Sequence, residues 1–158
     1  MGKDIITIKE ITNSNKKAEI TDAILHSLPD WFEVEKSISD YIESSQKLPF
    51  FVTEKDNQIV GFIVIEDFNE WASEIHVMGV LPEYRGKGIG KKLVEHVWAR
   101  NKKLGKKYLT VKTLDESAGD KFYSETRKFY TAMGFLPIMM STKIWDEENP
   151  CLIMIKEK

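Results

Sequence analysis

The chain has 158 residues, of which 42% are hydrophobic and 30% charged, and its formal net charge is -2. These values predict a single globular domain over residues 1–158 and argue against nucleic acid or an anionic membrane as a partner. The sequence contains neither the ~18-residue apolar run of a membrane span nor the apolar segment of a signal peptide. Cys151 is the single cysteine, so an internal disulfide is excluded and we expect a cytoplasmic protein.

In the first half of the chain, alternation with a period of two predicts a strand at residues 5–9. Further strands are predicted at 50–52, 59–65 and 72–81. A helix is predicted over 18–28, with Thr21 or Asp22 as its N-cap and Pro29 at its end. A second helical region is predicted from Trp31 to about residue 45. The turn at 55–57 is typical of a hairpin between two of these strands.

In the second half, apolar residues recur with helical spacing after residue 88, and Gly105 is a natural C-cap for that helix. A strand is predicted at 108–113, followed by a helix over about 122–133 that stops at Gly134. Closing strands are predicted at 135–145 and 151–156. This order of elements predicts an α+β fold, with a mixed, mostly antiparallel sheet and helices on both faces.

Three alternating glycines mark the junction between the strand at 72–81 and the following helix. Gly86, Gly88 and Gly90 alternate with Arg85, Lys87 and Ile89. Glycines allow backbone N–H groups to approach an anion, and a helix start has N–H groups without intrahelical partners. The pattern therefore predicts a pyrophosphate site. It is neither a Walker loop nor a dinucleotide fingerprint, because Lys91 stands where the latter needs glycine.

The segment Arg85-Gly86-Lys87-Gly88-Ile89-Gly90 matches the [RQ]-x-x-G-x-G/A signature of the GCN5-related N-acetyltransferases. The segment K-F-Y-T-A-M-G-F at 128–135 resembles the F-Y-x-x-x-G-F segment of the same family. The order of elements also agrees over most of the chain. The resemblance implies the fold of that family and acetyl-CoA as co-substrate, with its pyrophosphate held by the loop at 85–90.

The resemblance also implies how the pantetheine arm of acetyl-CoA is held. In the family, the strand before the loop carries a bulge, which Gly79 would mark here, and the arm pairs with backbone groups near Met78 and Val80. The N–H of Met78 is then the expected donor to the thioester carbonyl. The alternative is that Gly79 only packs against a large side chain.

Tyr130, from the F-Y-x-x-x-G-F segment, is the candidate acid that meets the departing thiolate, with Tyr123 as a weaker substitute. Unchanged turnover of Tyr130→Phe would contradict this role, and a core aromatic is the alternative. Glu74 matches the position of the base glutamate in one branch of the family, and alternation places it on one strand face with His76 and Met78. His76 is the alternative base or relay, and ordered water is a third possibility.

Trp31 and Phe32 are the candidate acceptor-binding residues, at the turn between the first two helices, and Trp71 and Trp145 are further aromatic candidates. Carboxylates near the end of the strand at 59–65 would attract a cation, namely Glu66, Asp67 and Glu70. Core aromatics and solvated carboxylates are the alternatives. We expect Cys151 to be a buried structural residue, and the spacing of the three histidines predicts no metal site.

We therefore expect an acetyl-CoA-dependent N-acetyltransferase that acts by direct attack in a ternary complex. The expected acceptor is a primary amine of a small molecule, and the expected assembly is a monomer or homodimer. A peptide α-amine, a lysine side chain, a polyamine and an antibiotic remain open as acceptors. The alternatives are a non-catalytic acyl-CoA sensor and an enzyme for another acyl group or an oxygen acceptor.

Overall fold

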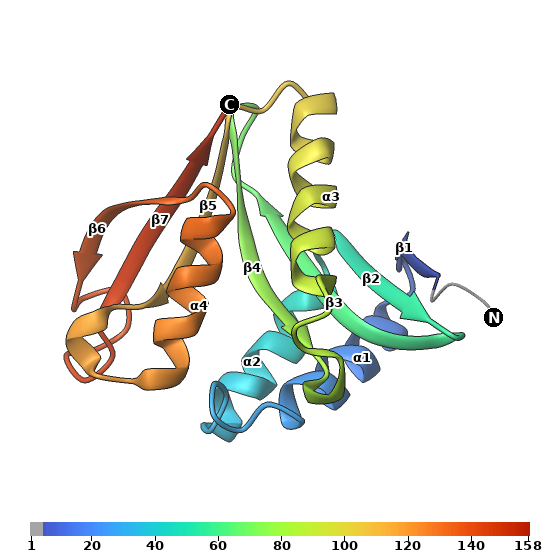
Figure 1. The fold of residues 1–158 in the computed structure, drawn as a ribbon, viewed down its shortest axis with the longest axis horizontal. Helices are drawn as coiled ribbons and strands as arrows, with labels where there is room; N and C mark the ends of the chain where they lie inside the picture. Colours follow the sequence, from blue (N-terminus) through green and yellow to red (C-terminus); the bar gives the residue numbers. More distant parts are fainter. Residues whose placement is uncertain (1–4) are drawn as a thin grey trace. The chain divides into compact units, whose positions relative to one another are not determined.

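The computed structural model describes residues 5–158, and within them a seven-stranded sheet has the order β1-β2-β3-β4-β5-β7-β6 (Figure 1). The pairs β1–β2, β2–β3, β5–β7 and β6–β7 are antiparallel, whereas β4 and β5 are parallel. The mixed, mostly antiparallel α+β fold is thereby confirmed. The strands are β1 Ile6–Glu10, β2 Phe50–Lys55, β3 Gln58–Asp67, β4 Ala72–Val80, β5 Tyr108–Leu114, β6 Leu136–Ser141 and β7 Cys151–Glu157. The α-helices of this part of the chain are α1 Ser14–His26, α2 Glu35–Ser45, α3 Ile89–Lys103 and α4 Lys121–Ala132.

The described chain divides into two compact units. The first runs to Glu66 and resumes over His76–Arg100, and the second comprises Asp67–Ile75 and Asn101–Lys158. The single domain that the sequence predicts stays a prediction. None of the helices within residues 5–158 combines the length and apolar character that crossing a membrane requires.

The core of the first unit lies where α1 and α2 meet the strands β2 and β3. Ile24 and Leu25 of α1 and Ile38 of α2 are buried in one cluster with apolar strand residues. The rings of Phe50 and Phe62 stack within it, with centroids 5.4 Å apart. Burying one such side chain contributes about 1.5–3 kcal/mol, so this cluster holds both helices to the sheet.

Both predicted helix starts in the first unit are wrong. The α1 helix begins at Ser14 because Asn13 caps it, accepting a hydrogen bond from the N–H of Lys16 at 2.9 Å. The expected cap Thr21 is instead buried within the helix and donates to the carbonyl of Lys17. The α2 helix begins at Glu35, because the chain at Trp31 still forms a turn on Leu28.

The predicted hairpin between β2 and β3 is confirmed. Asp56 and Asn57 both have positive φ, 53° and 63°, and Lys55 pairs with Gln58 across the turn. This is the two-residue hairpin geometry that matches the twist of the flanking strands, and Asp and Asn tolerate it.

In the second unit, α4 begins at Lys121 because the side chain of Asp120 accepts from the N–H groups of Phe122 and Tyr123. The predicted glycine stops after α3 and α4 are confirmed, since Gly105 and Gly134 have φ of 74° and 94°. The predicted strand at 135–145 is too long. The observed β6 ends at Ser141, and Asp146 organises a turn by accepting from the N–H of Asn149.

One electrostatic contact between α1 and α2 should make stability depend on pH. His26 lies 2.8 Å from carboxylate oxygens of both Asp22 and Glu35, and its hydrogen bond with Glu35, then that with the Asp22 carbonyl, raises its pKa above 6.5. Because its pKa is raised in the folded state, protonated His26 stabilises the fold fully at pH values below its unfolded-state pKa. This stabilisation is lost as the pH rises through the folded-state pKa. We expect urea unfolding to show a larger destabilisation by His26→Ala at pH 5.5 than at pH 8.5. Equal destabilisation at both values would contradict it.

Candidate functional site

The glycine loop adopts a backbone that needs glycine. After β4 and a short 3-10 turn at Pro82–Tyr84, Gly86 and Gly88 have φ of 73° and 77°, and α3 begins at Ile89. A Cβ added at either glycine would meet nothing within 4 Å, so packing does not require glycine there. The requirement is conformational, and it leaves exposed backbone beside a helix start. These features fit a phosphate group.

The first unit brings Trp31 to this loop. The guanidinium of Arg85 lies 4.0 Å from the centroid of the Trp31 ring, a cation–π contact. The ammonium of Lys87 lies 5.4 Å from the ring of Tyr84. The sequence predicts Trp31 as an acceptor-binding residue. In the structure it contacts Arg85, whose side chain is predicted to bind phosphate.

The strand β4 presents the other predicted binding groups. Met78 and Val80 are half-buried along it. A Cβ at Gly79 would meet side-chain atoms of Ile24, Leu28 and Phe62 at 3.0–3.2 Å. The space at this position is therefore tight, which fits the alternative interpretation that Gly79 packs against large side chains, and the bulge stays a prediction.

His76 lies in an aromatic and polar cluster with α2. Its Nε2 is 2.7 Å from the hydroxyl of Ser44, and its ring contacts that of Tyr41 edge-to-face at 5.4 Å. Tyr41 in turn contacts the ring of Phe32 at 6.0 Å. The structure thus links two predicted site residues, His76 and Phe32, through Tyr41. No sequence motif marks Tyr41 or Ser44, although their i, i+3 spacing places them on one helix face.

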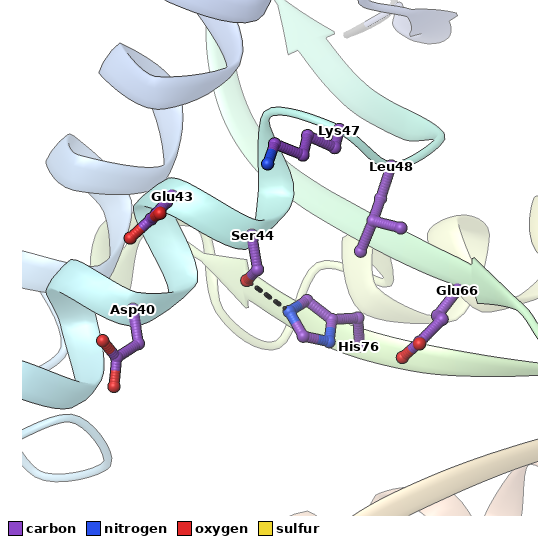
Figure 2. Close-up of a pocket in the computed structure, with 7 residues that line it drawn as sticks. All are labelled: Asp40, Glu43, Ser44, Lys47, Leu48, Glu66 and His76. Carbon is purple, nitrogen blue, oxygen red and sulfur yellow. Dashed lines mark hydrogen bonds between the residues drawn. The ribbon is translucent and has the colours of Figure 1, made fainter.

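A pocket of about 420 Å³ opens beside this cluster (Figure 2). Figure 2 shows the side chains of Ser44 and His76 pointing toward one another, with Glu66 of β3 also at the pocket. Three carboxylates and one ammonium group line it, so its charge favours a cation. The lining residues are Asp40, Glu43, Ser44, Lys47, Leu48, Glu66 and His76. The predicted cation-attracting residues Asp67 and Glu70 are not among them.

Glu74 has different partners from His76. It is buried at 6% exposure in the second unit, and it pairs in register with Thr110 of β5. Its carboxylate accepts from the Thr110 hydroxyl at 2.8 Å and from the Lys112 ammonium at 2.5 Å. These contacts make Glu74 the buried member of a partly buried ion pair between two strands.

Tyr130 is buried in the last turn of α4, with its ring 5.3 Å from that of Phe129 and 5.4 Å from that of Phe135. Cys151 is buried in β7, and burial raises the pKa of its thiol to about 11, which disfavours the nucleophilic thiolate. Within residues 5–158, His, Cys, Asp and Glu side chains form no group that could hold a metal ion.

Comparison with known proteins agrees with this architecture. A family model described as an acetyltransferase (GNAT) domain matches residues 46–137. An uncharacterized N-acetyltransferase of Chlorobaculum tepidum is 29% identical over 75% of this chain and 70% of its own length. An uncharacterized N-acetyltransferase of Archaeoglobus fulgidus is 36% identical to this chain. The match covers 44% of this chain and 54% of the Archaeoglobus protein. A GNAT family acetyltransferase of Elizabethkingia anophelis, solved with acetyl-CoA bound, has a TM-score of 0.74 and 20% identity, covering 99% of this chain and all (100%) of that one.

Proposed function

This chain belongs to the GNAT family of acetyl-CoA-dependent N-acetyltransferases, and we propose that its acceptor is the primary amine of a small molecule. The observation that carries this proposal is the pocket beside His76, whose three carboxylates favour a cationic ligand. An alkyl amine arrives mostly as an ammonium ion, since its pKa is about 10.4 when it is lysine-like. A pocket of about 420 Å³ suits a small molecule.

The donor site that we propose is the glycine loop. Backbone N–H groups from Arg85 to Gly90 would hold the pyrophosphate of acetyl-CoA, and the side chains of Arg85 and Lys87 would add positive charge. The contact of Arg85 with Trp31 supports this, because it fixes the direction of the guanidinium. Backbone groups of Met78 and Val80 are the proposed partners of the pantetheine arm.

His76 is the proposed base. The amine must lose a proton before it attacks, and His76 lines the pocket, whereas Glu74 is held by Lys112 and Thr110 in the other unit. The deprotonated nitrogen attacks the acetyl carbonyl carbon, the C–N bond forms, and the C–S bond breaks to release the thiolate of CoA. The N–H of Met78 is the proposed donor to the oxyanion, and Tyr130 is the proposed acid for the thiolate.

The experiment is thiol release from acetyl-CoA, measured against a panel of polyamines, amino acids, aminoglycosides and short peptides. We expect release with a small cationic amine, with the N-acetylated product found by mass spectrometry. Release only with the peptides would favour a protein amine as acceptor. Binding of acetyl-CoA without release across the panel would contradict the proposal and favour the sensor alternative.

A further inference from the structure

We propose that Ser44 is a positioning residue for His76, and that its hydroxyl serves both protonation states of the imidazole. The inference rests on the proposed function, because it matters for turnover only if His76 takes the proton of the amine. It concerns a residue that the sequence motifs do not mark. The geometry that points to it is the 2.7 Å contact between Ser44 Oγ and His76 Nε2.

Ser44 is held in place from two sides. It lies in the last turn of α2, whose Ile38 is buried in the apolar cluster with α1. The chain just after α2 is tied to α1 by Lys17, a lysine with only 8% exposure, which donates from Nζ to the carbonyl of Leu48 at 2.7 Å. A side chain on such an anchored turn can hold the imidazole in one orientation, as a hydroxyl on a mobile loop cannot.

The hydroxyl of Ser44 has two acceptors within reach. One is Nε2 of His76 at 2.7 Å, and the other is the carbonyl of Tyr41 at 3.4 Å. When the ring is neutral with Nε2 unprotonated, the hydroxyl donates to Nε2. When the ring is protonated, Nε2–H donates to Oγ and the hydroxyl proton turns to the Tyr41 carbonyl. The second arrangement includes a charge-assisted bond, which is the stronger, so Ser44 favours the protonated ring.

Four charged groups line the pocket together with the ring. Asp40, Glu43 and Lys47 come from α2 and the turn after it, and Glu66 comes from β3. The three carboxylates favour the imidazolium and Lys47 opposes it. They remain in place when only the hydroxyl is removed, so a comparison of Ser44 variants isolates the effect of the hydroxyl.

The test is an NMR pH titration of the His76 ring, assigned with His76→Gln, in the full chain. We expect Ser44→Ala to lower the pKa of His76 by about one unit. Ser44→Thr, which keeps a hydroxyl, should restore most of the wild-type value. Ser39→Ala is the matched control, because Ser39 is an exposed serine of the same helix, and it should change nothing.

Turnover supplies the second readout. With the amine found active in the panel, Ser44→Ala should shift the acidic limb of the kcat/KM profile in the same direction as the NMR pKa and lower kcat several-fold, and Ser44→Thr should recover both. Equal His76 pKa values in wild type and Ser44→Ala would overturn the inference, whether or not an acceptor is found. A lowered NMR pKa with an unshifted kcat/KM profile would overturn His76 as the base, and with it the positioning role.

Discussion

Replacement of His76 by glutamine should lower kcat/KM for the acceptor amine about a hundredfold, because a positioned general base contributes roughly 10²–10⁴-fold. Glutamine keeps polar atoms beside Ser44 but cannot take up a proton near neutral pH. The loss should be greatest near neutral pH, where the amine is still mostly protonated and wild-type His76 can accept its proton, and smaller at pH 10. The measurement is a pH–rate profile of kcat/KM for wild type and variant.

The matched control for this prediction is His96→Gln. His96 is a half-buried histidine of α3 whose ring contacts Phe51, 4.9 Å away, and it is not in the lining of the pocket. The His96→Gln variant should leave the pH profile of kcat/KM unchanged. Wild-type kcat/KM across the whole profile in His76→Gln would show that another group, such as Glu74 or ordered water, takes the proton.

Replacement of Glu74 by alanine should lower the free energy of unfolding by about 2 kcal/mol, because it breaks a buried ion pair and leaves Lys112 and Thr110 without that partner. The value is below the usual range for a buried pair because the Lys112 side chain is 33% exposed and can recover water. The measurement is urea unfolding at pH 7. In the folded protein at saturating substrate, kcat should stay within about threefold of wild type, since Glu74 acts here through structure.

Glu54→Ala is the control for the Glu74 prediction. Glu54 pairs with Lys9 between β1 and β2, and both side chains are more exposed than Glu74, at 23% and 46%. An ion pair of this kind contributes at most about 1 kcal/mol. A Glu74→Ala variant that unfolds like wild type but loses turnover a hundredfold would reverse the assignment and make Glu74 the base.

The two experiments together separate a chemical role from a structural one at neighbouring positions of β4. The motif resemblance favours Glu74 as the base, since it matches the position of the family's glutamate. The contacts favour His76, because only His76 lies at the pocket. We expect activity to follow His76 and stability to follow Glu74.

Elements whose signals are local can be predicted from the sequence alone. The hairpin at Asp56 and Asn57 follows from residues that tolerate positive φ, and the glycine loop follows from backbone freedom at Gly86 and Gly88. The helix stops at Gly105 and Gly134 have the same origin. The start of α1 was missed because its cap, Asn13, precedes the apolar periodicity from which the helix was predicted.

The partners of the candidate site residues, by contrast, depend on contacts between segments that are far apart in the sequence. His76 meets Ser44 from 32 residues away, and Glu74 meets Lys112 from 38 residues away. Trp31 stacks on Arg85, a contact that the turn after α1 makes possible. Strand alternation places Glu74 and His76 on one face but carries no information on which distant side chain covers each. Which side chain contacts each residue depends on helix packing and strand register. Both are set by burial of the whole apolar core, so no local sequence pattern contains this information.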